Sequence, residues 1–354
     1  MGNLRLIAVV VWLAATAFAV DNDEAQAAFC KYVTEQAAAQ RDLLRTPSVM
    51  VGPVRPSTGT APQMVLGVTN SLADTTKASL IVKVGHTTCA LYSATSEAQQ
   101  HIAYALASIE KDALRHRLEL IQHAVDKLDA VAANEVKLLQ AQNATRPAIY
   151  YLESARFHLE NSRTAALTGI ASSYVPPLSD IPLRSLIRDK QDAEQANQKA
   201  TTGLAKESGW DIKLSGGAHR QLGQFTPDTA KVGAFGEFNL TYDLGRHAAN
   251  KHYDNSVAAY VDWKASQLDD VTRQAIILKK QIEDTIEIQL VQLKGLLAHD
   301  ADMEKQLQTL DGLDSSNALS FKNQLFADQT SLRVDIEDVQ FRLARLQQYL
   351  IDNF

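Results

Sequence analysis

One segment constrains the fold of this chain more than any other. In VGAFGEFNLTYDLG, residues 232–245, apolar residues or glycine occupy every second position, and Phe235 is the one apolar residue that falls among the polar positions. Alternation with a period of two is typical of a β-strand that has one apolar and one polar face. Most of the remaining chain has helical spacing. The fold must therefore bury the apolar face of a strand that lies in a largely helical protein.

The sequence predicts a short helix, a very long helix and a return helix in each half, at about 24–46, 74–142, 148–172, 184–207, 246–310 and 317–352. None of the nine prolines falls inside a predicted long helix, where proline would be strongly destabilising. At 1.5 Å per residue the two longest helices would each span roughly 100 Å. Rods of this length bury narrow seams rather than one thick core.

Two strands are expected after each short helix, at 48–56 and 61–72, and again at 210–222 and 232–245. The third strand is the weakest of the four, because its alternation is lost at Gly216-Gly217. Residues 64–92 align with residues 236–264 at a constant offset, mainly through the shared alternation of the strands. The sequence therefore predicts a duplicated helix–strand–strand–helix unit, with a first repeat, a connection and a second repeat at residues 20–175, 176–183 and 184–354.

The N-terminus has the pattern of a secretory signal. Arg5 precedes the apolar run LIAVVVWLAATAFA, which ends in the small-x-small sequence Ala17-Phe18-Ala19. We expect residues 1–19 to be removed on export. The alternative is a membrane anchor, for which the run is short.

The net charge and the two cysteines indicate which partners and which cellular compartment to expect. The formal net charge is −6 without a prominent basic cluster, so we expect no nucleic-acid partner. Cys30 and Cys89 are expected to form a disulfide in an exported protein. Cys30 lies 18 residues before Ser48 and Cys89 lies 17 residues after Leu72, which would place both sulfurs at equal depth, about 26 Å from the strands.

An open sheet with an exposed apolar face invites aggregation, and the smallest membrane barrels need eight strands. Four strands from each of three copies would give twelve. On this interpretation the lipid-facing side chains include Phe238, Leu240 and Tyr242, and the lumen-facing ones are Glu237, Asn239, Thr241 and Asp243. The alternative is a soluble sandwich with the apolar face in its core.

This layout resembles the TolC-like family of outer-membrane efflux and secretion channels. The resemblance rests on the signal sequence, the duplicated unit, the unequal helices and the strand that runs into a long helix at FNLTYDLGRHAANKHYDN. It implies a mainly α protomer whose four strands join a twelve-stranded trimeric outer-membrane barrel, with helices forming a periplasmic tunnel. It also implies a passive exit duct of a tripartite system, which works with a periplasmic adaptor and an inner-membrane transporter in a Gram-negative cell.

The resemblance also implies roles for residues at the helix tips. Adaptor-contacting tips of the family carry a glycine followed by a small hydroxyl residue and an apolar residue. In this chain the tips are the breaks between long and return helices, at 143–147 and 310–316. The second tip approximates the family pattern, and the first lacks the glycine. The candidate tip residues are Asn143, Thr145, Arg146, Gly312, Ser315 and Ser316. Glu153 and Asp328 are candidates for an acidic constriction, with ordinary solvated helix acids as the alternative.

We found no pattern that favours an enzyme or a cofactor. His116 and His123 share a helix face without a metal-ligand cluster, and neither a phosphate-binding glycine loop nor a nucleophile elbow is present. We therefore expect no catalytic, cofactor or metal site. Two alternatives to a small-molecule duct remain. One is an outlet for polysaccharide or protein, and the other is a periplasmic or surface structural protein, a coiled-coil stalk with a β head.

Overall fold

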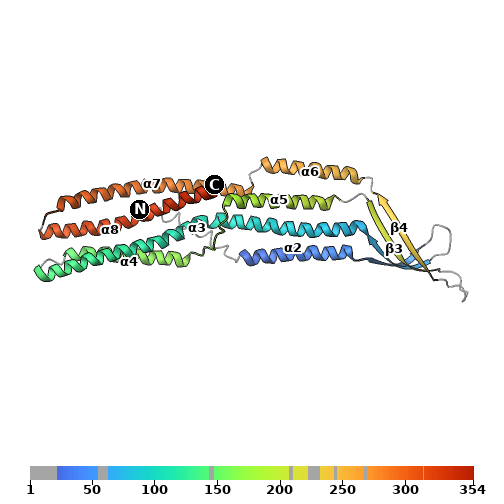
Figure 1. Cartoon of the computed structure of the whole chain (residues 1–354), viewed down its shortest axis with the longest axis horizontal. Helices are drawn as coiled ribbons and strands as arrows, with labels where there is room; N and C mark the ends of the chain where they lie inside the picture. Colours follow the sequence, from blue (N-terminus) through green and yellow to red (C-terminus); the bar gives the residue numbers. More distant parts are fainter. Residues whose placement is uncertain are drawn as a thin grey trace. The chain divides into compact units, whose positions relative to one another are not determined.

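A computed structural model gives the structure of the chain. It describes residues 22–54, 63–142, 147–206, 210–221, 232–242, 245–266, 269–313 and 315–354. The expected signal sequence, residues 1–19, lies outside the described residues. The fold consists of helices and one four-stranded antiparallel sheet (Figure 1).

The order helix–strand–strand–helix–helix occurs in both halves of the chain. The first half contains α2 (Asn22–Arg45), β1 (Ser48–Val54), β2 (Gln63–Ser71), α3 (Leu72–Gln142) and α4 (Pro147–Ser172). The second half contains α5 (Leu183–Ala205), β3 (Trp210–Gln221), β4 (Val232–Tyr242), α6 (Arg246–Ser266), α7 (Asp270–Leu310) and α8 (Ser316–Asn353). This order is the repeated helix–strand–strand–helix unit expected from the sequence.

The second long helix differs from the prediction. Whereas α3 is continuous over 71 residues, the predicted helix at 246–310 is divided into α6 and α7, with Asp269 outside both. Aspartate is favoured directly before a helix because its carboxylate accepts hydrogen bonds from the first turn. The Asp269 carboxylate also pairs with Lys190 of α5, which favours a break at this position over a continuous helix.

The chain divides into two compact units, and each is described by itself. One unit contains the sheet with α2, residues 186–205 of α5, α6 and residues 72–98 of α3. Here Cys30 of α2 and Cys89 of α3 form a disulfide with their Cα atoms 4.9 Å apart, which confirms the predicted pairing. The rings of Phe29 and Tyr92 stack beside it with centroids 4.2 Å apart.

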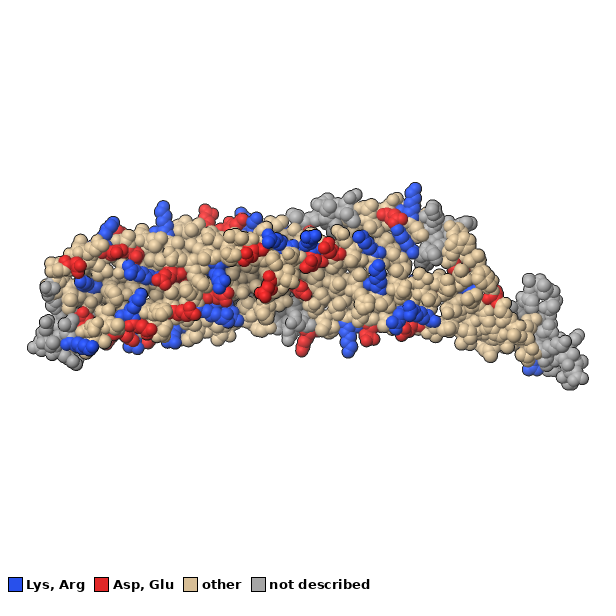
Figure 2. Space-filling view, in the orientation of Figure 1, with Lys and Arg blue, Asp and Glu red and all other residues tan. Residues whose placement is uncertain are grey.

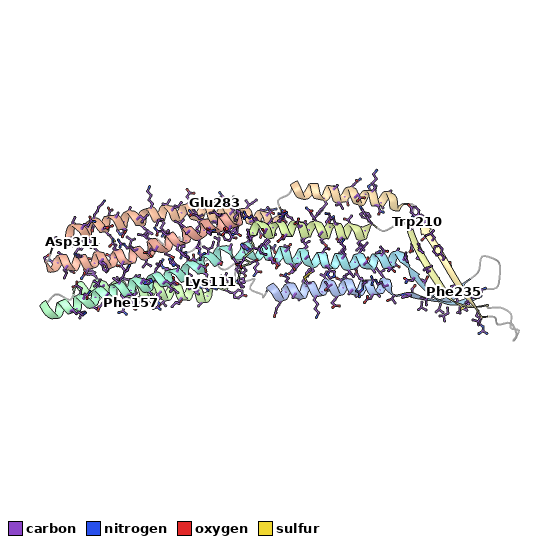
Figure 3. The ribbon with its side chains drawn as sticks, viewed as in Figure 1. Lys111, Phe157, Trp210, Phe235, Glu283 and Asp311 are labelled. Atoms are coloured by element: carbon purple, nitrogen blue, oxygen red, sulfur yellow. A yellow bond between two sulfur atoms is a disulfide. The ribbon has the colours of Figure 1, made fainter. Side chains whose placement is uncertain are left out.

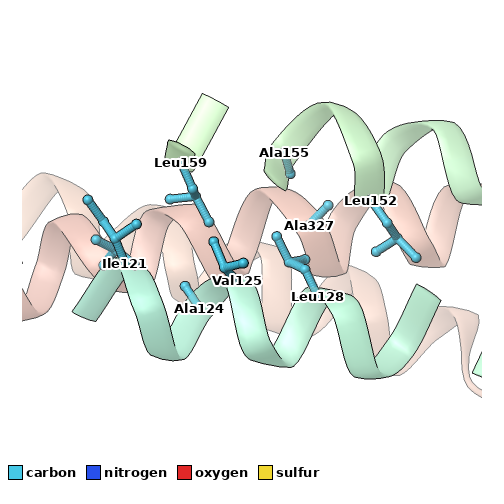
Figure 4. Close-up of a cluster of buried hydrophobic side chains, with 9 residues drawn as sticks. Ile121, Ala124, Val125, Leu128, Leu152, Ala155, Leu159 and Ala327 are labelled. Atoms are coloured by element: carbon cyan, nitrogen blue, oxygen red, sulfur yellow. The ribbon is translucent and has the colours of Figure 1, made fainter. Parts of the chain in front are cut away.

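The other unit contains α4, α8, residues 99–142 of α3, residues 183–185 at the start of α5 and residues 271–310 of α7. Its largest apolar cluster is a narrow seam of aliphatic side chains from α3, α4 and α8, including Ile121, Leu128 and Leu152 (Figure 4). Farther along α3, Arg117 pairs with Asp335 and Asp338 of α8, each at 2.7 Å. Long helices with small and aliphatic residues thus bury seams, as the sequence predicted.

Charged side chains of both signs are distributed over the helices of both units, and few lie over the strands on the face shown in Figure 2. Within the described part of the chain, none of the helices combines the length and apolar character that a membrane-spanning helix requires.

Candidate functional site

The sheet is the most unusual surface of the protein, and its register fixes the direction of each side chain. Strand order is β1-β2-β3-β4, with every neighbouring pair antiparallel. Residues directly opposite in such a pair lie on the same face. The register places Val51 opposite Leu66, Leu66 opposite Ala218, and Ala218 opposite Ala234, so a single row of apolar side chains crosses all four strands.

The face that contains this row is uncovered and mainly apolar, and its polar members are Asn70 and Arg220. Phe238 is 63 % exposed and Leu240 is 49 % exposed. The other large exposed side chains of this face are Val49, Val51, Met64, Leu66, Val68, Trp210, Leu214, Val232 and Tyr242. The chain's own described helices do not bury these side chains, so the soluble sandwich, in which they form a core, does not describe this single chain.

The third strand keeps its alternation through the paired glycines, which corrects the prediction that it is lost there. Gly216 lies opposite Val68 and Gly236 on the apolar face, and Gly217 lies opposite Gly67 on the other face. A Cβ atom at Gly217 would come within 2.1 Å of the Leu66 carbonyl oxygen. The glycine therefore permits close approach of two strands and does not interrupt the pattern.

The opposite face is mainly polar near the strand ends that join the helices. Asp211 of β3 forms an ion pair with Lys213 at 3.5 Å and accepts a hydrogen bond from the Ser71 hydroxyl at 2.7 Å. Ser71 in turn accepts a hydrogen bond from the Asp74 backbone N–H, so it caps α3. Thr69 and Ser215 are hydrogen-bonded through their hydroxyls. We did not select these residues from the sequence, although the alternation of Asp211, Lys213 and Ser215 is a visible signal.

Phe235 has a structural explanation on this polar face. It lies in one register row with Gly217, Gly67 and Met50, and a Cβ atom at Gly67 would approach the Phe235 ring to 2.8 Å and the Met50 methyl to 3.2 Å. The ring thus lies over glycines of the neighbouring strands, an arrangement that compensates for their missing side chains. Figure 3 shows Phe235 on the sheet, well separated along it from Trp210.

The residues predicted for the two faces fall on opposite faces of β4 where they are described. Glu237, Asn239 and Thr241 lie on the face opposite Phe238, Leu240 and Tyr242, and Asp243 lies outside the described residues. The rings of Trp210 and Tyr242 are 4.5 Å apart at the helix-proximal end of the apolar face. Paired aromatics at such a boundary are typical of a membrane interface.

The second helix tip contains a compact turn. Gly312 has a positive φ of 88° and ends α7, and the Ser315 hydroxyl accepts a hydrogen bond from the Ala318 backbone N–H and caps α8. Lys322 donates to the Asp311 carboxylate at 3.1 Å across the turn. Ser316 begins α8, whereas the residues predicted at the first tip, Asn143, Thr145 and Arg146, lie outside the described residues.

The predicted constriction residues are solvent-exposed helix acids in the single chain. Glu153 lies on α4 and Asp328 on α8, and both are exposed. In the described ranges, we found no group of three or more histidine, cysteine or acidic side chains arranged to hold a metal ion. His116 stacks on Phe341 with ring centroids 4.2 Å apart, a packing role in the seam of α3 with α8.

The chain is similar to several outer-membrane proteins of known structure. The outer-membrane channel OprN shares 14 % identity over 90 % of this chain and 85 % of its own, with a TM-score of 0.40. VceC, an outer membrane protein of Vibrio cholerae, shares 14 % identity over 93 % of this chain and 92 % of its own, with a TM-score of 0.41. The MtrE outer membrane channel of Neisseria gonorrhoeae shares 12 % identity over 93 % and 86 %, with a TM-score of 0.44. No protein-family model and no curated protein matches the chain.

Proposed function

We propose that three copies of this chain join their sheets into a closed twelve-stranded barrel in the outer membrane, and that the barrel is the exit duct of an export system. The exposed apolar face of the sheet is the observation that supports this most directly. A contiguous apolar surface of this kind marks contact with a membrane or a partner. Its opposite face carries Asp211, Lys213, Glu237 and Asn239, which suits the wall of a water-filled lumen.

The open edges of the sheet support closure between copies. β1 and β4 are the two edge strands, and their outer backbone groups need partners inside a membrane. Pairing β4 of one copy with β1 of the next is a head-to-tail contact, which forms a ring. β2, β3 and β4 have 9, 12 and 11 residues, lengths that suit a tilted crossing of the hydrocarbon layer.

The helices would form the wall of a periplasmic tunnel. α7 buries Val271, Leu278 and Ile282 within the chain, yet exposes Ile288 and Val291 at 63 % and 71 %. Exposed apolar side chains also occur on α4, at Tyr150 and the labelled Phe157 (Figure 3). We infer that these surfaces pack against neighbouring copies, because long helices bury such seams on assembly.

The two helix tips would serve for docking and for control of the tunnel width. The turn at Gly312 and Ser315, together with the first tip, would contact a periplasmic adaptor coupled to an inner-membrane transporter. Glu153 and Asp328 would narrow the tunnel near the tips, where a ring of carboxylates favours cations. The chain itself would perform no chemistry, and the transporter would supply the energy.

A matched pair of variants tests the face assignment. Phe238→Arg places a charge near the middle of β4 on the proposed lipid face, at a cost of about 2–4 kcal/mol near the membrane midplane, and we expect loss of trimers from the membrane fraction. Glu237→Gln changes the proposed lumen face and should assemble normally. Equal behaviour of the two variants would contradict the assignment, and a lack of conductance from purified trimers in planar bilayers would favour a stalk over a pore.

A further inference from the structure

The start of α5 is capped by a residue from the far end of the chain. α5 begins at Leu183, directly after Pro182, whose side chain has no hydrogen-bonding group. The Leu183 backbone N–H donates instead to Oδ1 of Asn353 at 2.8 Å, over a sequence separation of 170 residues. Both residues are buried. The last turn of α8 is therefore fastened to the first turn of α5 by one amide side chain.

A buried histidine lies in the same place. His101 of α3 is 6 % exposed, and its ring lies 5.9 Å from that of Tyr349 on α8. The Asn353 side chain lies beside the imidazole and favours its charged form. Within the described residues, however, neither ring nitrogen of His101 nor the Tyr349 hydroxyl makes a hydrogen bond of normal geometry. Buried polar atoms without partners are uncommon and costly, so this cluster is less stable than the apolar seam around it.

The surroundings of His101 offer little to balance a positive charge. From α8 it meets Tyr349, a phenol whose pKa is raised by burial, and Asn353, whose amide side chain is uncharged. On α7, Lys279 lies over the Phe354 ring, which contacts Tyr349. On α3 the nearest acid is Glu97, one helical turn before His101, and its side chain is exposed to solvent. On α8, Arg345 and Asp352 lie one turn to either side of Tyr349 and are also exposed. Glu110 and Arg342, about 13 Å along the helix from His101, pair with each other.

We propose that His101, Tyr349 and Asn353 form an acid-sensitive latch between α3, the end of α8 and the start of α5. At neutral pH the imidazole is uncharged and the latch is closed. Protonation would place a cation in a buried site without a buried anionic partner, and the site gains water only by opening. Opening frees the Leu183 N–H and releases the last turn of α8.

The sign of the pH dependence follows from burial. Desolvation lowers the pKa of His101 in the closed state, whereas in the open state it returns toward about 6.5. The open state thus binds the proton more tightly, and its population rises as the pH falls below about 6.5. The stabilisation by a neutral His101 is fully present above that pH and decreases below it. This inference concerns one unit of the protein and does not depend on the channel function.

Hydrogen–deuterium exchange on the full-length protein in detergent tests the latch. Between about pH 7.5 and pH 5, on either side of the reference histidine pKa, we expect exchange of peptides covering 343–354 and 183–186, corrected for intrinsic rates, to rise about tenfold. His101→Phe keeps an aromatic ring and removes the titrating group, so this rise should disappear. His116→Phe is the matched control, because His116 also lies on α3 and stacks on α8, and the rise should persist.

A second variant keeps the proposal testable if His101→Phe fails to fold. Asn353→Asp retains an oxygen acceptor for the Leu183 N–H and adds a carboxylate beside the imidazole. The protonated imidazole then has a partner, so the acid-induced rise in exchange should be suppressed. Exchange that is independent of pH in the wild type would overturn the latch, as would an equal rise in wild type, His101→Phe and Asn353→Asp.

Discussion

The two helix pairs that flank the sheet occupy corresponding places in the two repeats, yet they are held together by different forces. α2 and α3 are joined by a disulfide, an aromatic stack and a close contact at Gly85. α5 and α6 are joined by polar contacts, including the Tyr260 hydroxyl, which donates to Glu194 at 2.6 Å, and an ion pair of Lys206 with Asp254. Duplication has preserved the order of elements without preserving the means of packing.

This difference predicts unequal responses to solution conditions. Covalent and apolar contacts are insensitive to salt, whereas ion pairs at partly exposed sites are screened. The described part of α6 is also largely exposed to solvent. We therefore expect α6 to be released from its neighbour more easily than α2, and the following variants test that expectation in order of decreasing effect.

The largest effect is expected from the disulfide. The double variant Cys30→Ser/Cys89→Ser removes a cross-link over a sequence separation of 59 residues, and the free energy of unfolding should fall by about 4 kcal/mol. Thermal unfolding with hydrogen exchange of α2 peptides measures this. Reduction of the wild type with a thiol reagent should reproduce the result, and an unchanged α2 would show that the other α2–α3 contacts suffice.

A smaller effect is expected in the second pair. Lys190 is 5 % exposed and lies between the carboxylates of Glu194 and Asp269. Lys190→Met leaves both acids without their cation, and we expect a loss of about 2 kcal/mol in the free energy of unfolding. Exchange of α6 peptides should increase, and that of α2 peptides should stay constant.

Lys206→Met is the control for that change, because its partner Asp254 is largely exposed. Such surface pairs contribute less than about 1 kcal/mol. An effect as large as that of Lys190→Met would mean that burial does not set the importance of the two ion pairs.

Two glycine-to-alanine substitutions should have the smallest effects on the free energy of unfolding, and these effects should be of opposite sign. A Cβ atom at Gly85 would approach the Ala37 Cβ to 2.8 Å, whereas one at Gly203 of α5 would meet nothing within 4 Å. We expect Gly85→Ala to destabilise by about 1 kcal/mol through crowding, and Gly203→Ala to stabilise by about 0.5 kcal/mol through helix propensity. Denaturant titration measures both. Ala37→Gly in the Gly85→Ala background should relieve the crowding; failure to do so would place the clash elsewhere.

The sequence predicted those parts of the fold that depend on local pattern. The positions of prolines and the change from helical to alternating spacing located the helices and strands to within a few residues. The alternation around Leu240 predicted which side chains share a face. The cysteine pairing was also predictable, because both positions follow from counting along helices on either side of one strand pair.

The remaining features depend on partners that are distant in the chain. Phe235 is apolar on a polar face because its ring covers Gly67 of β2, and no local pattern reveals that neighbour. The division at Asp269 reflects an ion pair with Lys190 from another helix, although the consecutive aspartates Asp269 and Asp270 at the start of α7 are a usable helix-start signal. The capping of Leu183 by Asn353 joins residues too far apart for any spacing rule.

Site-directed spin labelling tests the central claim most directly. Labels at Leu240→Cys and Asn239→Cys, on opposite faces of one strand, would be compared in lipid bilayers by their accessibility to oxygen, which concentrates in lipid, and to a water-soluble nickel complex. We predict that the label at residue 240 collides mainly with oxygen and the label at residue 239 mainly with nickel. Equal accessibility of both labels to the nickel complex would contradict a lipid-facing sheet.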